Sequence, residues 1–487
     1  MSSGGASRRA PRPAPDEVPA AAAALLQRPL EDTLFWYPAA GRAEQSLRRI
    51  TGVIFLRAAA RVAASLPPAS AYLNLCRDPC GTAIALAAAM LRSTPCVLVT
   101  DPSPAGIAML LEQFPQAHPL MDEGATRPPA FAAASIATPQ LGDAWGAVPV
   151  NPVFPKALTA LIGVTSGSSG KPSAHAKGWG ALEARNRAAA ARFGLMGGGQ
   201  QRLLVGTVSP THMYGMETMV LLPLHAAIIT WCAPCFLPGD AAAGLAEAAR
   251  IAGDPEMPAG SVAPEPIFIT TPLHLGALLE AATPLPPMHA VISATAPLDP
   301  TLATRAEALW NAPVMEIFGA TEVGSIASRR TAREAAWTLY DGVSLTRRDE
   351  VVQAAAEGAP ATALSDVLDL LSPRQFRLVS RGTDIIKRGG RRASLAGLTR
   401  ILAGLEGVRD AAFLMPEPAP GRSATERPIA FAVAPGRDAA DLLAELRGLV
   451  EPAFLPRRIL LLDHLPRNEI GKLPRDALLA LLTPAAP

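Results

Sequence analysis

The stretch TSGSSGKPSAHAKGW, residues 165–179, gathers glycines and small hydroxyl residues in one loop and continues into a His-x-Lys-x-Trp sequence. Such a loop lets backbone N–H groups approach a phosphate closely. It is not the phosphate loop of kinases and ATPases, Gly-x-x-x-x-Gly-Lys-Ser/Thr, because Thr165 and Pro172 occupy the positions of the first glycine and the final hydroxyl. A Gly/Ser surface linker remains an alternative for the loop alone.

Around this loop, apolar runs of strand length alternate with helical stretches. Residues 71–75 precede an Ala-rich helix over 82–93, and residues 96–101 precede a helix over 106–114. This order predicts an α/β fold in which parallel strands are covered by helices. Further strands are predicted at 160–165, 202–208, 226–231, 266–270, 290–294 and 314–318.

Several of these strands end in small or hydroxyl residues. Ligands of open α/β sheets gather beyond the carboxyl ends of the strands. The sequence therefore predicts one crevice bordered by Thr165-Ser166, Ser209-Pro210, Ser293-Ala294 and Gly319-Ala320.

The chain is expected to have two domains after a disordered, Pro-broken tail over residues 1–27. A large N-terminal domain of mixed parallel sheets covered by helices is predicted over 28–380. From Asp366 the sequence changes to a short predicted strand pair, a basic segment and a single helix. This change places a domain boundary near Ser380 to Asp384. A small, mobile α+β domain is predicted over 381–487, joined by a hinge.

Composition excludes several classes of function. The 487 residues carry a net charge of only +2, so no basic field for a nucleic acid is expected. Thr218 to Gly239 lacks charge but contains three prolines, which favours a buried helix followed by a strand over a membrane span. The start lacks the continuous apolar segment of a secretory signal.

Five cysteines are too few for a disulfide scaffold and predict a reducing, cytoplasmic location. Cys232 and Cys235, in WCAPC, look like the active-site pentapeptide of thioredoxins. Pro238 would interrupt the helix that this chemistry needs, so a buried loop is the favoured interpretation.

Four motifs occur in an order that resembles the adenylate-forming superfamily, which includes acyl-CoA synthetases, aryl-acid ligases and luciferase-like enzymes. They are TSGSSGKP at 165–172, FGATEVG at 318–324, SRGTDIIKRGGRRAS at 380–394 and LPRNEIGKLPRDAL at 465–478. Together they cover about residues 150 to 480. Each motif alone is moderate evidence, but the ordered set is specific.

The resemblance implies where ATP and Mg²⁺ bind. Thr321 would meet the AMP phosphate, and the carboxylate of Glu322 would hold magnesium, a hard cation that prefers oxygen ligands. A helix N-cap followed by a first-turn acid is the plainer interpretation of this pair. The residues implied to approach the phosphates are Thr165, Ser166, Gly167, Ser168, Ser169 and Gly170.

The same resemblance implies a nucleoside site. Asp366 stands at the acid that binds the two ribose hydroxyls, with Arg381 as its partner. The preceding Thr-Gly of the family is absent, so Asp369 is an alternative to Asp366. Thr295 and Ala296 lie in the segment that packs on adenine.

Lys472 matches the catalytic lysine of the family. An ammonium between the substrate carboxylate and the α-phosphate would relieve their repulsion and stabilise the charge that develops during transfer. A solvated terminal lysine is the alternative. The resemblance also implies rotation of the small domain near Thr383, where the family has Asp or Lys; the adjacent Gly382 would ease the backbone change.

The loop departs from the family at Ser173, where a lysine is usual. His175, Lys177 and Trp179 would share one face of an extended segment, so His175 or Lys177 could supply the missing charge to the phosphates. An edge strand with a solvated cationic face is the alternative. His-x-Lys-x-Trp also looks like the branch of ligases associated with aryl-polyene pigment pathways, which charges an acyl carrier protein. His212, in SPTHMYGME, resembles the residue that contacts the acid, although a lone histidine is often structural.

The expected function is ATP-dependent activation of a carboxylic acid to an acyl- or aryl-adenylate and transfer to a phosphopantetheine thiol, on an acyl carrier protein or in CoA. A catalytically weakened binding protein that keeps the fold is the alternative suggested by Ser173 and the missing Thr-Gly. A thioredoxin-like reductase is more distant. The acid and the oligomeric state do not follow from the sequence.

Overall fold

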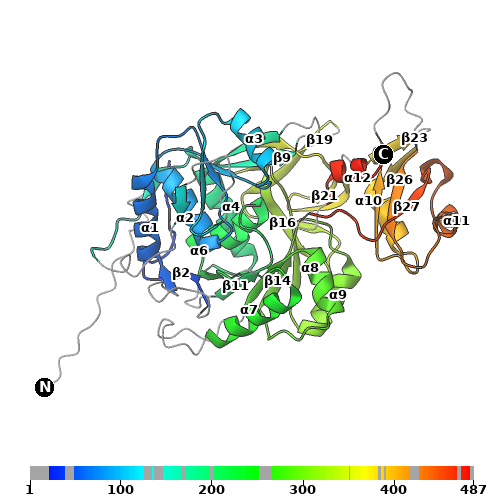
Figure 1. Ribbon diagram of the computed structural model, residues 1–487, viewed down its shortest axis with the longest axis horizontal. Coiled ribbons are helices and arrows are strands. Elements are labelled where there is room, and N and C mark those ends of the chain that lie inside the picture. The colour runs from blue at the N-terminus through cyan, green and yellow to red at the C-terminus, as the bar shows by residue number, and fades with distance from the viewer. Residues whose placement is uncertain are drawn as a thin grey trace. The chain divides into compact units, whose positions relative to one another are not determined.

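The computed structural model divides the chain into two compact units (Figure 1). The first comprises Met1–Ser344 and Ala355–Thr362, and the second comprises Leu345–Ala354 and Ala363–Pro487. The structure describes residues 21–38, 49–125, 134–136, 146–166, 172–196, 202–233, 235–251, 266–349, 351–381, 385–388, 391–416, 427–468 and 473–482. Residues 1–20 of the predicted tail lie outside the described residues, but its end is ordered: Ala22–Ala24 form a strand, and Leu25 and Leu26 are buried. The boundary predicted near 380–384 falls largely outside the described residues and remains a prediction.

One sheet of the first unit has the strand order β10-β9-β5-β4-β6-β7. Its central strands are parallel, and β10 runs antiparallel to β9 at the edge. The outer apolar face packs on α3 through Leu110, against Val97 and Ile162. The bounds are β4 Tyr72–Asn74, α2 Pro79–Leu91, β5 Cys96–Leu98, α3 Pro104–Gln113, β6 His118–Asp122, β7 Ala134–Ile136, β9 Thr159–Ser166 and β10 Pro172–Gly178.

A second sheet of this unit has the order β17-β16-β15-β14-β13-β11-β12-β2-β3. Strands β2, β12, β11, β13, β14 and β15 are parallel, while β16 returns antiparallel to β15. The bounds are β2 Thr33–Trp36, β3 Arg49–Thr51, β11 Arg202–Gly206, β12 Ile228–Trp231, β13 Ile267–Thr270, β14 Ala290–Ser293, β15 Val314–Ala320, β16 Gly324–Arg330 and β17 Trp337–Leu339. A separate antiparallel pair joins β1 (Ala22–Ala24) and β8 (Val153–Pro155).

Helices cover both faces of this second sheet. α7, α8 and α9 close one apolar core, in which Trp231, Phe268 and Trp310 are buried (Figure 1). The other face packs on α4 and on a π-helix, η3, through buried Leu204, Ile269 and Ile292. The bounds are α4 Trp179–Arg192, α5 Met213–Gly215, η3 Met216–Leu221, α6 Leu222–His225, α7 Pro238–Ile251, α8 Pro272–Glu280 and α9 Pro300–Trp310.

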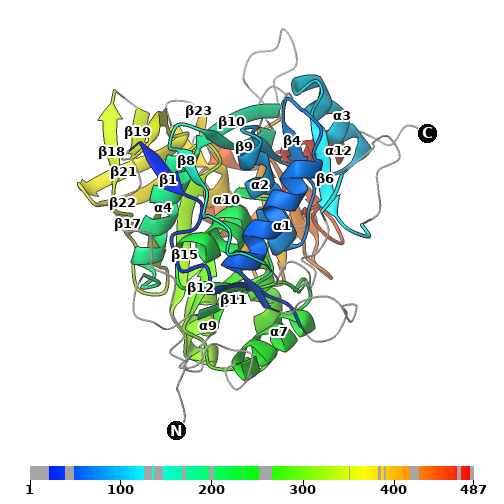
Figure 2. The same cartoon turned by 90° about the vertical axis from the view of Figure 1, so that its left-hand side faces the viewer.

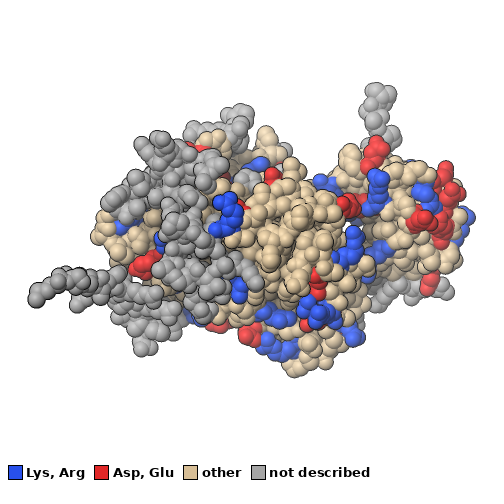
Figure 3. Space-filling model, turned by 90° about the horizontal axis from the view of Figure 1, so that it is seen from below, with Lys and Arg blue, Asp and Glu red and all other residues tan. Residues whose placement is uncertain are grey.

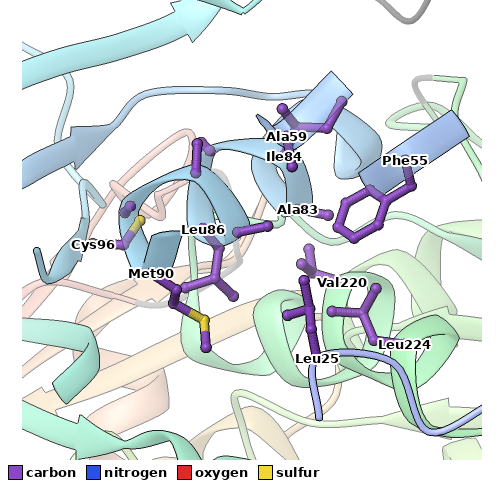
Figure 4. Packing of buried hydrophobic residues seen from close by; sticks show 14 of the residues in the cluster. Leu25, Phe55, Ala59, Ala83, Ile84, Leu86, Met90, Cys96, Val220 and Leu224 are labelled. Carbon is purple, nitrogen blue, oxygen red and sulfur yellow. The ribbon is translucent and has the colours of Figure 1, made fainter. Parts of the chain in front are cut away.

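Helix α2 lies at the centre of the largest apolar cluster (Figure 4). Every residue from Cys80 to Met90 is buried, as expected for a helix that is apolar all round. Asp78 caps its start by accepting from the N–H groups of Cys80 and Gly81, and Pro79 occupies its first turn. α1 (Gly52–Ser65) packs beside it (Figure 2). The small side chains of α2 therefore allow close approach of its neighbours on all sides.

The second unit has its own apolar core, built on the sheet β25-β26-β27. Leu402 and Leu446 are fully buried in it, and Phe431 is fully buried in a second cluster with Leu465 and Leu478. A hairpin of β21 and β22 and a second one of β23 and β24 precede it along the chain. The bounds are β21 Asp366–Ser372, β22 Gln375–Arg381, β23 Ile385–Arg388, β24 Arg391–Ser394, α10 Leu395–Ala403, β25 Asp410–Leu414, β26 Ile429–Val433, α11 Ala439–Leu449, η5 Pro452–Phe454, β27 Ile459–Leu461 and α12 Arg475–Ala480. The chain divides between the units within β18 (Val343–Arg348), β19 (Val351–Ala356) and β20 (Ala359–Ala363).

The predicted fold class is confirmed: strands form at each predicted apolar run, and parallel sheets are covered by helices. The uncharged window from Thr218 forms η3, α6 and β12, as the buried-helix interpretation predicted. Within the described residues, no helix has the length and apolar character needed to cross a membrane. On the face shown in Figure 3, acidic and basic side chains both occur on the described surface.

Candidate active site

The hairpin of β9 and β10 carries the glycine- and serine-rich stretch that begins at Thr165. Thr165 and Ser166 end β9 and lie opposite Ser173 and Pro172 of β10. The side chains of Thr165 and Ser166, and all of Gly167, Ser168, Ser169 and Gly170, lie outside the described residues. Their contacts with phosphate therefore stay predictions, although the two strands fix where the loop leaves and re-enters the sheet.

The turn between β15 and β16 lies against this hairpin. A Cβ placed on Gly163 of β9 would come within 2.8 Å of the Thr321 Cγ2 atom, so only glycine allows this approach. Thr321 is half-buried and the Glu322 side chain is exposed. The fold thus brings together two motifs separated by about 150 positions in the sequence.

Lys177 connects the same two elements. Its side chain is only 9% exposed, and its Nζ atom donates a hydrogen bond to the backbone carbonyl of Glu322. Burial lowers the pKa of Lys177 to about 8, helped by the charge of Arg185 and opposed by Glu217 and Glu322. The solvated cationic face proposed as an alternative is therefore wrong for Lys177.

Trp179 does not continue the strand, contrary to the predicted face of His175, Lys177 and Trp179. β10 ends at Gly178, and Trp179 begins α4. Its indole is fully buried, donates from Nε1 to the carbonyl of Ala23 at 3.2 Å and stacks at a tilt on His225. The drive to bury a large aromatic side chain overrides the two-residue alternation.

A buried carboxylate that the sequence analysis missed holds the far end of the turn. Both oxygens of Glu217, in η3, accept from the backbone N–H of Ser325, at 3.2 and 3.1 Å. Burial raises the pKa of Glu217, while the Ser325 hydrogen bonds and the charges of Arg185 and Lys177 oppose the rise. A single acid next to the apolar run from Thr218 was the available signal.

The segment that carries His212 is tied to the sheet by its neighbour. His212 is half-buried and precedes α5, with its backbone carbonyl accepting from Met216 N at 2.7 Å. The hydroxyl of Tyr214 donates to the carbonyl of Ile292, in β14, at 2.8 Å. This bond places the predicted acid-binding segment beside the carboxyl end of β14.

The residues predicted to pack on adenine follow β14 directly. Thr295 has a φ of +80°, which is rare for a β-branched residue, and Ala296 is half-buried. Leu298 N donates to the Glu316 Oε1 atom at 2.9 Å, and that buried carboxylate also accepts from Arg329 and Thr331. Glu316 is thus a second residue that sequence reasoning missed; an acid inside the apolar strand VMEIF was its signal.

The predicted ribose site belongs to the second unit. Asp366 and Arg381 are paired across β21 and β22, and Asp366 is half-buried. Asp369 is exposed and lies opposite Arg377. The side chain of Arg381 and all of Gly382, Thr383 and Lys472 lie outside the described residues. The predicted hinge and catalytic lysine therefore remain predictions.

The thioredoxin-like interpretation finds no support in the geometry. Cys232 and Cys235 are buried, unlinked thiols, and burial raises the pKa of Cys235 to about 12. A redox-active cysteine needs a lowered pKa and access to its partner. Among the described residues, no group of acids, histidines and cysteines forms a ready metal cage.

Magnesium is the metal that the turn suits. One exposed carboxylate beside a half-buried hydroxyl fits a cation that keeps several waters and takes its remaining ligands from substrate phosphates. Glu322 would supply the carboxylate and Thr321 the neighbouring hydroxyl.

The comparisons with known proteins agree with this architecture. No protein-family model matches the chain. A 4-coumarate–CoA ligase of Rhodobacter capsulatus is 28% identical over 297 residues, which cover 59% of this chain and 66% of that enzyme, just under two thirds of its length.

Solved structures match over far more of the chain. ATP-bound MatB from Rhodopseudomonas palustris is 15% identical with a TM-score of 0.71, over 92% of this chain and 95% of that one. The o-succinylbenzoate CoA synthetase of Bacillus subtilis, in complex with its acyl-adenylate intermediate, is 17% identical with a TM-score of 0.72 over the same shares. That enzyme has also been solved with ATP and a magnesium ion. The chain thus has the fold of these adenylate-forming ligase structures, and it is similar in sequence to the coumarate ligase over part of its length.

Proposed function

We propose that this chain is an ATP-dependent ligase that joins a carboxylic acid to a thiol. The observation that carries the proposal is the packing of the β9–β10 hairpin against the Thr321–Glu322 turn, seen at Gly163 and at Lys177. An enzyme that acts on a nucleoside triphosphate needs a phosphate loop and a metal ligand side by side. The similar proteins named above are CoA ligases and synthetases, which supports the same reaction type.

The reaction has two steps. In the first, a carboxylate oxygen attacks the α-phosphorus of ATP, an oxygen–phosphorus bond forms, and pyrophosphate leaves. In the second, a thiol sulfur attacks the acyl carbon, AMP leaves, and the thiol proton passes to solvent. Bound magnesium would offset the negative charge of the phosphates.

The residues of the chain would hold the reactants in line for the first step. The hydroxyls and backbone of Thr165 to Gly170 would hold the phosphates, and Thr321 would contact the α-phosphate. His212 would orient the acid. Asp366 and Arg381 would bind the ribose, and Thr295 and Ala296 would pack on adenine.

Lys472 would neutralise the approach of two anions, the acid and the α-phosphate. It would arrive with the C-terminal domain, which rotates about the segment at Gly382 and Thr383 between the two steps. Replacement of Lys472 by alanine is expected to lower the rate of adenylate formation by about 100-fold or more, the scale of one lost transition-state contact. An unchanged rate of adenylate formation would contradict this role.

The acceptor is proposed to be a phosphopantetheine thiol, the group that CoA and carrier proteins share. The His-x-Lys-x-Trp ending favours a carrier protein, as in the branch of ligases associated with aryl-polyene pathways. A reducing cytoplasm would keep that thiol available. Mass spectrometry of a candidate carrier protein, and of CoA, after incubation with ATP and mixed aryl and fatty acids distinguishes the two acceptors.

ATP–pyrophosphate exchange with a panel of carboxylic acids tests the activity itself. Exchange with at least one acid is expected. No exchange with any acid, together with no ATP binding, would overturn the proposal. ATP binding without exchange would instead support the weakened binding protein suggested by Ser173.

A further inference from the structure

Two buried ionic side chains grip the turn that carries Glu322. Lys177, from β10, donates to the carbonyl of Glu322, and Glu217, from η3, accepts from the N–H of Ser325. The first contact holds the front of the turn and the second holds its end. The two side chains come from elements that are distant from the turn in sequence.

The surroundings of Gly324 restrict the backbone conformation of the turn. Gly324 has a φ of +74°, and a Cβ there would lie 2.5 Å from the Glu217 Oε1 atom and 3.1 Å from a guanidinium nitrogen of Arg185. Positive φ favours glycine, and a side chain at this position would have to displace the Glu217 carboxylate. The backbone of the turn is thus shaped around Glu217.

The cluster of charges is itself anchored. Asn186, in α4, donates from Nδ2 to the backbone carbonyl of Glu217 at 2.7 Å, and its Oδ1 atom accepts from the Nδ1 atom of His225 at 3.0 Å. Lys177, Arg185 and Glu217 lie close enough together to shift one another's pKa values. Buried charges of this kind persist where they compensate one another, and removal of one partner leaves the others uncompensated.

We propose that Lys177 and Glu217 are positioning residues that act through the backbone of the Thr321–Ser325 turn to aim the Glu322 carboxylate at the metal–nucleotide complex. Neither side chain touches the nucleotide in this role. Lys177 therefore compensates for Ser173 by fixing the metal ligand, whereas a substitute lysine would contact the phosphates directly. The proposal rests on the function proposed above, because it takes Glu322 as the metal ligand.

The role predicts a metal-dependent defect. Outer partners of metal ligands typically contribute about 10- to 100-fold to metal affinity. Lys177→Met and Glu217→Gln are each expected to weaken binding of Mn²⁺ in the presence of ATP by about 10-fold or more. Binding of ATP without metal should fall by a smaller factor than binding of Mn²⁺ with ATP, because it depends on the turn only through Thr321.

The experiment uses the full chain, with Mn²⁺ followed by electron paramagnetic resonance and ATP binding followed by calorimetry, with and without metal. Lys177→Arg, which keeps the donor, should recover most of the lost affinity. The double variant should lose less than the sum of the single losses, because both act on one turn. Glu183→Gln, another buried acid that pairs with Arg187 at 3.1 Å on α4, is the matched control and should bind like the parent.

Each result decides one question. If the parent chain binds neither ATP nor Mn²⁺ with ATP, the proposed function fails. If the parent binds both and the variants bind equally well, or lose ATP with and without metal alike, the positioning role is overturned. If Lys177→Met does not fold, Lys177→Gln and Glu217→Gln carry the same comparison.

Discussion

Two backbone segments of the first unit are held by buried glutamates, and the two glutamates work differently. Glu316 accepts from Leu298 N in the segment predicted to pack on adenine, and Arg329 contacts its carboxylate at 2.8 Å. Glu217 accepts from Ser325 at the end of the turn, and Arg185 and Lys177 act on it electrostatically. We therefore expect Glu316, which is paired directly with an arginine, mainly to stabilise the fold, and Glu217, whose hydrogen bonds come from Ser325, mainly to position the turn.

The largest effect of a substitution at neutral pH is expected from Glu316→Ala. The change would leave Arg329 without its partner and two buried donors, Leu298 N and the Thr331 hydroxyl, without an acceptor. Loss of one partner of a buried pair costs about 3–5 kcal/mol of the free energy of unfolding. Urea unfolding of the full chain measures it.

Glu247→Ala is the control, because its partner Arg250 is 80% exposed. The control should lie within about 0.5 kcal/mol of the parent. If Glu316→Ala unfolds at the same urea concentration as Glu247→Ala, the stabilising role of Glu316 is wrong.

Gly324→Ala should cost less than Glu316→Ala, about 2–4 kcal/mol, because it combines a positive φ with a clash against Glu217. Gly342→Ala provides a matched comparison. Gly342 has the same φ of +74° and no heavy atom within 4 Å of an added Cβ. Its substitution should cost about 1 kcal/mol, from backbone strain alone. Thermal unfolding of both variants isolates the cost of the close approach, and equal melting temperatures would show that Glu217 does not shape the turn.

The buried His225 should make the fold less stable at low pH, because the ring resists protonation in the folded state. Burial lowers the pKa of His225 to about 3, from an ordinary value of 6.5. The stabilising contribution is complete above pH 6.5, where both states are neutral, and is lost as the pH falls, because only the unfolded chain gains the proton. The free energy of unfolding should decline by about 1.4 kcal/mol per pH unit between 6.5 and about 3 from this group alone.

His225→Gln removes the titrating ring. The free energy of unfolding of this variant should therefore fall less steeply with decreasing pH than that of the parent, by about 1.4 kcal/mol per pH unit. Urea unfolding at several pH values below 6.5 gives the difference between the two proteins. Parallel curves would mean that His225 is protonated equally in the folded and unfolded states.

The smallest effect concerns Thr295, which holds a φ of +80° in the segment fixed by Glu316. Thr295→Gly should raise the free energy of unfolding by about 0.5–1 kcal/mol, because glycine adopts this backbone without strain. If the strained conformation serves adenine, calorimetry should show weaker ATP binding in the more stable variant. If the variant binds ATP as tightly as the parent, the strained backbone at Thr295 does not contribute to adenine binding.

The fold followed from the sequence because its signals are local. Runs such as 266–270 and 290–294 are too apolar and too short to be anything but buried strands between helices, and they form β13 and β14. Four ordered motifs then indicated a resemblance to the adenylate-forming superfamily, whose fold the chain shares. The positions of these elements needed no knowledge of distant contacts.

The sequence predicted only part of the site, because the residues that support it make contacts with residues far away along the chain. Lys177 meets a carbonyl 145 positions away, so its alternation in β10 suggested a solvated face. Glu217 and Glu316 lie inside apolar segments, where a single acid gives no indication of its partner. Trp179 was predicted to continue the strand because the alternation of residues contains no information about the core in which the indole is buried.

The wide turns of η3 determine the angle at which Glu217 reaches Ser325. A π-helix closes its hydrogen bonds between residues i and i+5 and thus holds an extra residue compared with an α-helix over the same stretch. Deletion of one residue from Met216–Leu221 would turn everything before it by about 100° relative to α6, given 3.6 residues per turn. Tyr214 would then leave the carbonyl of Ile292, or the packing of α6 would be lost. We expect a homologue that is one residue shorter here to hold the corresponding turn by other contacts, so chain length at this helix is a marker for comparing homologues.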